Sequence, residues 1–158
     1  MSRSAQSTPS ESERIALANS TDADLVISLS VDKYPNEKAE GISTYFYGSE
    51  LHGIHSIVGE RFATIVQREL VARTDLLNAR THSKTWDLLR LTKAPTVRIE
   101  MGYATNPKDA SRLADSHFRD VIAEGVVVAI QRLYLSAEED AKTGTLRIED
   151  LRRAGIRR

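Results

Sequence analysis

Glu100 and Arg98 are the residues whose types and spacing most directly suggest chemistry. They lie in residues 95–107, "PTVRIEMGYATNP", where apolar and polar side chains alternate. Because successive side chains of a β-strand point to opposite faces, Arg98 and Glu100 share a face. A glutamate leaving an apolar strand could act as a general base, but an arginine about 7 Å away along the strand could instead neutralise it. Spacing alone leaves both interpretations open.

A second group of polar residues follows the apolar run 25–29, "LVISL". Ligands of α/β folds gather at the carboxyl ends of strands, so Ser30 and Asp32 are expected near Glu100 and Asn106. Catalysis by a Ser/His/Asp triad is weakly supported, because the chain has no G-x-S-x-G motif. A nucleotide-binding loop is also not indicated, since no glycine-rich segment ends in Lys-Ser or Lys-Thr.

The four histidines are His52, His55, His82 and His117. His52 and His55 are three residues apart, a spacing that on a helix would let them share a metal. They precede a helix in a glycine-containing loop, so two solvated loop histidines are the competing interpretation. For His82 and His117 no second ligand is evident nearby, and we expect ordinary surface roles.

Composition excludes several classes of function. The 158 residues, 41% of them hydrophobic, suit one globular domain. Acidic and basic residues balance at 22 each, which argues against a general nucleic-acid binder. The absence of cysteine excludes disulfides and Cys-ligated zinc. Neither a signal peptide nor a membrane span is evident, so we expect a cytoplasmic chain.

Periodicity and capping signals predict strands alternating with helices. We expect a helix over 9–19 with Thr8 as N-cap, Pro9 at its first position and Glu11 as capping-box partner. The further expectations are strands at 25–29, 41–48, 86–91 and 96–101, a polar connection at 78–85, and helices at 56–71, from Asn106 onward and at 116–135. Together they predict an α/β fold with a mixed sheet sandwiched between helices.

The expected organisation is a flexible N-terminus at 1–8, a domain at 9–135 and a charged tail at 136–158. The tail is expected to carry at most a short helix around 148–153. Within it, Thr143 and Thr145 are flanked by charges and are candidates for phosphorylation, which adds about −1.5 to −2 charge per site. An inert tail is the alternative.

The chain resembles the amidase-3 family of zinc-dependent N-acetylmuramoyl-L-alanine amidases over residues 13–134. The most specific matches are "EMGY" at 100–103 and "NPKD" at 106–109. The resemblance implies a mixed sheet flanked by helices, and hydrolysis of the bond between the muramoyl lactyl group and L-alanine. It also implies that Glu100 stands on the catalytic position.

Two departures from the family pattern qualify this resemblance. The segment "SLSVD" places Ser30 where a zinc-binding histidine belongs and Asp32 where an asparagine belongs. The family's first strand, with another histidine and a glutamate, would precede Met1. We therefore predict no metal or cofactor in this chain and a catalytically degenerate domain. Arg98 stands at a usually apolar position, so we predict that it pairs with Glu100, with Asp32 and Asn106 in the neighbouring groove.

A more specific resemblance is to the CwlM-type group of actinobacterial homologues, which share "RTH…TWDLLRLT" and a Thr-Gly-Thr tail. It implies control of peptidoglycan synthesis, with a Ser/Thr kinase acting on Thr143 and Thr145. The implied partner is a protein of peptidoglycan precursor synthesis or a muropeptide. Two alternatives stay open. One is an active zinc amidase with an altered ligand set that recruits His52 or His55 or uses residues upstream of Met1, and the other is a truncated remnant that folds poorly.

Overall fold

The structure, a computed structural model, describes residues 8–49 and 51–139. Along these residues the elements follow in the order α1 (Glu11–Ser20), β1 (Val26–Asp32), β2 (Ile42–Ser49), β3 (Ile54–His55), α2 (Ile57–Arg73), β4 (Asn78–Lys84), α3 (Asp87–Leu91), β5 (Thr96–Tyr103), α4 (Pro107–Ala114) and α5 (Ser116–Glu139).

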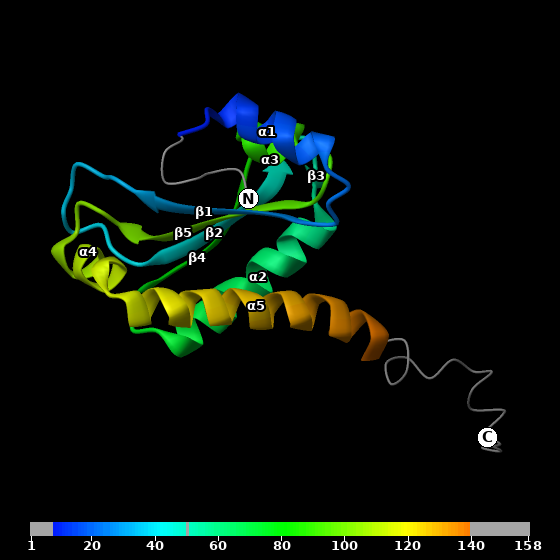
Figure 1. Cartoon of the computed structure of the whole chain (residues 1–158). Helices are drawn as coiled ribbons and strands as arrows, with labels where there is room; N and C mark the ends of the chain where they lie inside the picture. Colours follow the sequence, from blue (N-terminus) through cyan, green and yellow to red (C-terminus); the bar gives the residue numbers. More distant parts are fainter. Residues whose placement is uncertain (1–7, 50, 140–158) are drawn as a thin grey trace, which may run out of the picture.

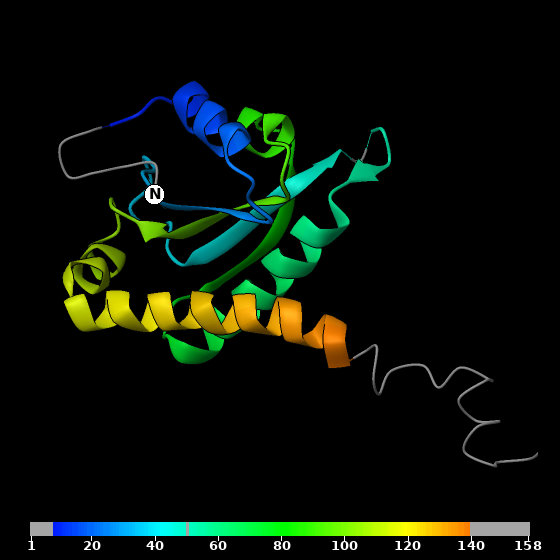
Figure 2. The ribbon, with the colours of Figure 1, turned by 45° about the vertical axis from the view of Figure 1, so that its right-hand side comes forward.

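A mixed sheet runs through the middle of the domain. β5 lies between β1, which is parallel to it, and β2, which is antiparallel to it. β2 also pairs in parallel with β4 and forms a short antiparallel hairpin with β3. Helices α2 and α5 cover one face of the sheet, and α1 and α3 lie on the other (Figure 1). Figure 2 shows the same layers after a turn of 45° about the vertical axis. The predicted α/β sandwich with a mixed sheet is confirmed.

The hydrophobic core lies between the sheet and the α2–α5 layer. Its fully buried members are Ile42, Phe62, Ala63, Val66, Leu70, Val97, Ile99 and Ala129. Phe62, Val66 and Leu70 recur every four residues, so they form one stripe of α2 that faces the sheet. Gly125 of α5 lets the two helices approach closely, because a Cβ there would lie 2.6 Å from Leu70 Cδ2.

The turn after β5 is organised by the buried carboxylate of Asp109. Its Oδ2 accepts hydrogen bonds from the backbone N–H groups of Gly41, at 2.9 Å, and Tyr103, at 3.1 Å. Arg112 Nη1 donates to Oδ1 at 3.1 Å. Gly102 has φ +131° and a Cβ there would lie 3.0 Å from Asp109 Oδ2, so only glycine suits this position. One carboxylate thus joins the start of β2, the end of β5 and helix α4.

The N-cap prediction at Asn106 is confirmed. Its side chain accepts hydrogen bonds from the N–H groups of Lys108 and Asp109, and Pro107 occupies the first turn. The prediction for the first helix is wrong in detail. The cap is Ser10 with Glu13 as its capping-box partner, rather than Thr8 with Glu11, and the helix begins at Glu11. Both Ser10 and Thr8 can cap, and the sequence contains a glutamate three residues after each.

Two other predictions are wrong. Residues 86–91, expected to be a strand, contain the short helix α3, in which the adjacent residues Leu88 and Leu89 are both buried. The expected polar connection at 78–85 contains strand β4. Its inward positions are the small or hydroxylated residues Ala79, Thr81 and Ser83 rather than large apolar ones. Thr81 and Thr44 hydroxyls are 2.9 Å apart across the ladder, so a hydrogen bond supports this pairing.

The edge strand β1 is only partly covered. An apolar run such as 25–29 is typical of a strand buried on both faces, but Leu29 is 52% exposed and Val31 42% exposed. At the other end of the chain, α5 continues to Glu139 and so extends into the segment assigned to the tail. The predicted helix around 148–153 lies outside the described residues, as do Thr143 and Thr145. No helix within the described ranges is long and apolar enough to cross a membrane.

We predict that Asp109→Ala lowers the free energy of unfolding by about 3–5 kcal/mol, the usual cost of removing one partner of a buried ion pair. The reason is that two backbone N–H groups and the Arg112 guanidinium lose their common acceptor. Urea denaturation measures the change. Asp75→Asn is the matched control, because Asp75 binds the same arginine from an exposed position. Equal losses in both variants would contradict a central role for Asp109.

Candidate functional site

Arg98 joins the two residues expected at the site. Its Nη2 lies 2.9 Å from Glu100 Oε1, and its Nε donates to Ser30 Oγ at 3.1 Å. The Glu100 side chain is 4% exposed and that of Arg98 29%. The predicted Arg98–Glu100 pair is therefore present, and Ser30 belongs to the same cluster.

The strand register brings these residues together. In the parallel β1–β5 ladder, Ser30 stands opposite Glu100, and in the antiparallel β2–β5 ladder Ser43 stands opposite it. Ser30 Oγ also donates to the carbonyl of Ile99 at 3.3 Å. Since Ser30 Oγ donates one hydrogen bond to β5 and accepts one from it, this hydroxyl joins β1 to β5.

Aromatic side chains cover this cluster from the α3 side. The guanidinium carbon of Arg98 lies 5.2 Å from the ring centre of Trp86, and Lys84 Nζ lies 5.9 Å from it. Tyr45 packs against Trp86 at 4.7 Å and stacks on His82 at 5.6 Å, measured between ring centroids. Arg98 is thus held by two polar partners and by one aromatic face, an arrangement that favours a fixed guanidinium.

The phenol of Tyr45 lies in the same environment. Ser43 Oγ donates to Tyr45 Oη at 3.0 Å. Burial, with a smaller contribution from the negative charge of Glu100, raises the pKa of Tyr45 to about 12, although the Ser43 hydrogen bond opposes the shift. Burial and the charges of Glu100 and Asp32 also raise the pKa of Tyr103. Both phenols are therefore neutral hydrogen-bonding groups near neutral pH.

Asp32 and Asn106, which are predicted to lie beside the Arg98–Glu100 pair, both make hydrogen bonds that hold the backbone. Asp32 Oδ1 accepts a hydrogen bond from Lys33 N–H at 2.7 Å, and its backbone carbonyl accepts one from Ala104 N–H at 2.8 Å. Asn106 is 6% exposed, and besides capping α4 it donates from Nδ2 to the Glu37 carbonyl at 2.8 Å. Asn106 therefore holds loops together rather than presenting a free side chain.

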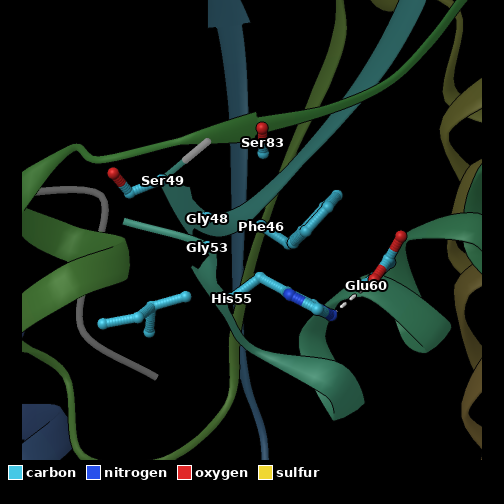
Figure 3. Close-up of a pocket in the computed structure, with 8 residues that line it drawn as sticks. Phe46, Gly48, Ser49, Gly53, His55, Glu60 and Ser83 are labelled. Carbon is cyan, nitrogen blue, oxygen red and sulfur yellow. Dashed lines mark ion pairs between the residues drawn. The ribbon is translucent and has the colours of Figure 1, made fainter. Parts of the chain in front are cut away.

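The histidines are dispersed over the surface. His55 Nε2 lies 3.1 Å from Glu60 Oε2, beside a cavity lined by Phe46, Gly48, Ser49, Gly53, Ile54 and Ser83 (Figure 3). His52 is exposed and lies on the turn before β3, so the two do not share a helix face. His82 stacks on Tyr45, and the exposed His117 donates its backbone N–H to Asp115.

The residues at Glu100 do not fit the zinc ion that the family resemblance implies. A zinc hydrolase site needs about three protein ligands and an open position for water. Within the described part of the chain, no group of three or more His, Asp or Glu side chains could hold a metal. The guanidinium of Arg98 also bonds both Ser30 and Glu100, so a positive charge already stands between these two positions.

Sequence reasoning missed the aromatic residues and Asp109. Trp86 begins a segment whose sequence predicts a strand, and Tyr45 lies within another predicted strand. Nothing in the local sequence of either residue places its ring beside Arg98. Asp109 lies three residues after Asn106, a position typical of the first turn of a helix, which does not indicate its buried contacts. The glycine at position 102 offered a signal, since a glycine within a strand often marks a close approach.

Comparisons with known proteins identify the family of the chain. The sequence model of the amidase-3 family, described as N-acetylmuramoyl-L-alanine amidase, matches residues 1–132. The N-acetylmuramoyl-L-alanine amidase CwlM of Mycobacterium tuberculosis is 44% identical over 151 residues, which cover 96% of this chain and 37% of CwlM. The chain thus spans little more than a third of that relative.

Solved amidase structures share the fold. An N-acetylmuramoyl-L-alanine amidase of Clostridium difficile 630 superposes with a TM-score of 0.75 at 26% identity, over 85% of this chain and 70% of that one. Ami1 of Mycobacterium smegmatis superposes with a TM-score of 0.73 at 24% identity. The match covers 86% of this chain and 66% of Ami1. CwlD of Clostridioides difficile, solved in complex with the GerS lipoprotein, superposes with a TM-score of 0.70 at 20% identity. The match covers 79% of this chain and 61% of the CwlD chain.

We predict that Arg98 and Glu100 are energetically coupled. Arg98→Met should lower the free energy of unfolding by about 1.5–3 kcal/mol, the usual contribution of a hydrogen bond to a charged group. Glu100→Gln should also destabilise, but the double variant should lose less than the sum of the two single variants, because the second change removes a partner already lost. Urea denaturation of all four proteins tests this. Strictly additive losses would show that the pair is not coupled.

We also predict a stability loss at alkaline pH that depends on Tyr45. A phenol whose folded pKa lies above its value in the unfolded chain stabilises the fold below about pH 10, and this stabilisation is lost as pH rises toward about 12. Tyr45→Phe should make that loss smaller. Denaturation at about pH 9 and about pH 11 measures it. An identical alkaline loss in wild type and variant would contradict the assignment to Tyr45.

Proposed function

Because the chain belongs to the amidase-3 family of N-acetylmuramoyl-L-alanine amidases, we propose that it acts in the peptidoglycan pathway as a binding and regulatory domain without hydrolytic activity. The observation that carries this proposal is the position of Arg98. Its guanidinium binds both Ser30, which the family resemblance puts on a zinc-ligand position, and Glu100, which the resemblance puts on the catalytic position.

The physical argument concerns charge and ligand type. A zinc-bound water becomes a useful nucleophile because the ion lowers its pKa to about 7. A serine hydroxyl is a much weaker zinc ligand than an imidazole, and the nearby guanidinium would repel a dication. Glu100 forms an ion pair with Arg98, as a structural carboxylate does, whereas a general base must be able to take up a proton. These features support loss of the hydrolytic reaction from this domain.

An active zinc amidase is the competing function. It is favoured by one observation, the retention of a buried carboxylate at Glu100 on the fold that solved amidases share. That reading requires further ligands besides the described residues near Glu100. It also requires Arg98 to leave the position in which Trp86 and Ser30 hold it.

The proposed partner is a protein of peptidoglycan precursor synthesis or a muropeptide. The complex of the related amidase CwlD with the GerS lipoprotein supports a protein partner, since it shows this fold engaged by another chain. For the tail, we propose that a Ser/Thr kinase modifies Thr143 and Thr145, and that the domain acts in the cytoplasm. Both statements rest on the sequence and its resemblance.

The test is a joint measurement of zinc and hydrolysis on the full protein. We expect elemental analysis to find no stoichiometric zinc, and no release of L-alanine-linked peptides from purified peptidoglycan by wild type or Glu100→Gln. An active amidase relative, assayed alongside, shows that the substrate is competent. Stoichiometric zinc together with peptide release that Glu100→Gln abolishes would establish the competing function.

A further inference from the structure

Three arginines converge on one buried carboxylate at the contact between helices α2 and α5, which pack together on one face of the sheet (Figure 1). The carboxylate is that of Glu69 in α2, whose side chain is 5% exposed. Arg73 Nη1 lies 2.5 Å from its Oε2, and Arg132 Nε, from α5, lies 3.3 Å from its Oε1. Arg68 Nη2 is 3.6 Å from the same Oε1. Two helices thus bring four charged side chains to one small area.

The position of Arg73 is explained by the helix itself. Arg73 is the last residue of α2, where a positive charge interacts favourably with the negative end of the helix dipole. Its Nη1 also donates to the backbone carbonyl of Glu69 at 3.1 Å. A glutamate and an arginine four residues apart are a common stabilising pair on a helix. Arg73 alone therefore neutralises Glu69.

Arg68 and Arg132 are not explained in this way. Arg132 lies well before Glu139, the last residue of α5, so the end of that helix does not account for its charge. The side chains of Arg68 and Arg132 are 63% and 55% exposed. Among residues 8–49 and 51–139, their guanidiniums have no polar partner besides Glu69. Each guanidinium has five N–H donors in a planar fork, so most of these donors can still bind a ligand.

The cluster carries a local surplus of positive charge. Three positive charges and one negative charge leave a net charge of +2, because arginine stays protonated at any pH relevant to proteins. Burial alone would raise the pKa of Glu69. The hydrogen bond from Arg73 and the positive charges of the three arginines outweigh burial and hold this pKa below its ordinary value, so the carboxylate is ionised. The chain as a whole has a formal net charge of zero, so the surplus belongs to this area.

A phosphate monoester complements this surplus in charge and in geometry. It carries about −1.5 to −2 charge near neutral pH and has three strong acceptor oxygens. A carboxylate or a phosphodiester carries only a single negative charge. Guanidinium forks suit pairs of phosphate oxygens, and Glu69 holds them in place before a ligand arrives, which lowers the ordering cost of binding. A membrane is a less suitable ligand, since basic patches that bind anionic lipids contain about four to eight Lys or Arg residues.

We propose that Arg68 and Arg132, held in place by Glu69, bind the phosphate group of a soluble phosphate monoester on the outer side of the α2–α5 layer. All the side chains of this site belong to α2 and α5. Arg98 and Glu100 lie on the α3 side of the sheet instead. The proposal therefore does not depend on whether the domain hydrolyses peptidoglycan.

An NMR titration of the full chain with methyl phosphate, at constant ionic strength, tests the site directly. We expect the Nε–H resonances of Arg68, Arg73 and Arg132 to shift along one common saturation curve. Dimethyl phosphate and acetate, each with a single negative charge, should bind several-fold more weakly. Arg90 is the internal reference and should not shift, since it belongs to α3 and pairs there with Asp87.

Removal of single charges identifies the binding residues. Arg68→Gln and Arg132→Gln should each weaken methyl phosphate binding about tenfold, the effect of losing one charged hydrogen bond. The double variant should no longer distinguish methyl phosphate from dimethyl phosphate. Arg90→Gln is the matched control, because it removes the same charge from another exposed helix, and it should bind as the wild type does. Both cluster arginines are largely exposed, so these variants should keep the fold, which circular dichroism verifies.

Three results would overturn the proposal. One is the absence of a saturable shift, or an equal affinity for methyl phosphate, dimethyl phosphate and acetate, which would indicate general screening by ions. Another is unchanged methyl phosphate binding in the double variant. The third is binding to vesicles that contain phosphatidic acid without binding to methyl phosphate, which would place the ligand in a membrane.

Discussion

The buried carboxylate of Asp109 fixes the part of the fold on which the candidate site depends. It is fully buried, and it accepts hydrogen bonds from the backbone at Gly41 and Tyr103 and from Arg112. Because these groups begin β2, end β5 and belong to α4, one side chain determines where β5 ends. Glu100 stands three residues before that end, so its position relative to β1 and β2 follows from the same constraint.

The chemistry of the site depends on how Arg98 is held. A guanidinium keeps its charge at any pH relevant to proteins, and its planar fork can bind two oxygen acceptors while a ring packs against its face. Here the acceptors are Ser30 and Glu100, and the ring is that of Trp86. All three partners come from different elements, β1, β5 and the start of α3. Arg98 therefore joins two strands and a helix on the sheet face opposite the main core.

Much of this fold could be predicted from the sequence, and the errors have physical causes. The hydrophobic periodicity of α2 and α5 and the capping signal at Asn106 are local features of the sequence. They predict these helices correctly. Strand β4 lacks large apolar side chains, so its local sequence does not indicate a strand. Its pairing with β2, supported by the hydrogen bond between Thr81 and Thr44, depends on residues far apart in the sequence. At the site, strand periodicity predicted the pairing of Arg98 with Glu100. The contribution of Trp86 depends on residues brought together only by the fold.

The position of Trp86 also has a practical consequence. It is the one tryptophan in the chain, it is 37% exposed, and its ring lies against Tyr45 and beneath the Arg98 guanidinium. Indole emission responds to nearby charge and to solvent contact. The intrinsic fluorescence of this protein therefore comes from a single reporter on the face that carries Glu100, and a molecule that binds there or displaces Arg98 can be followed without any label.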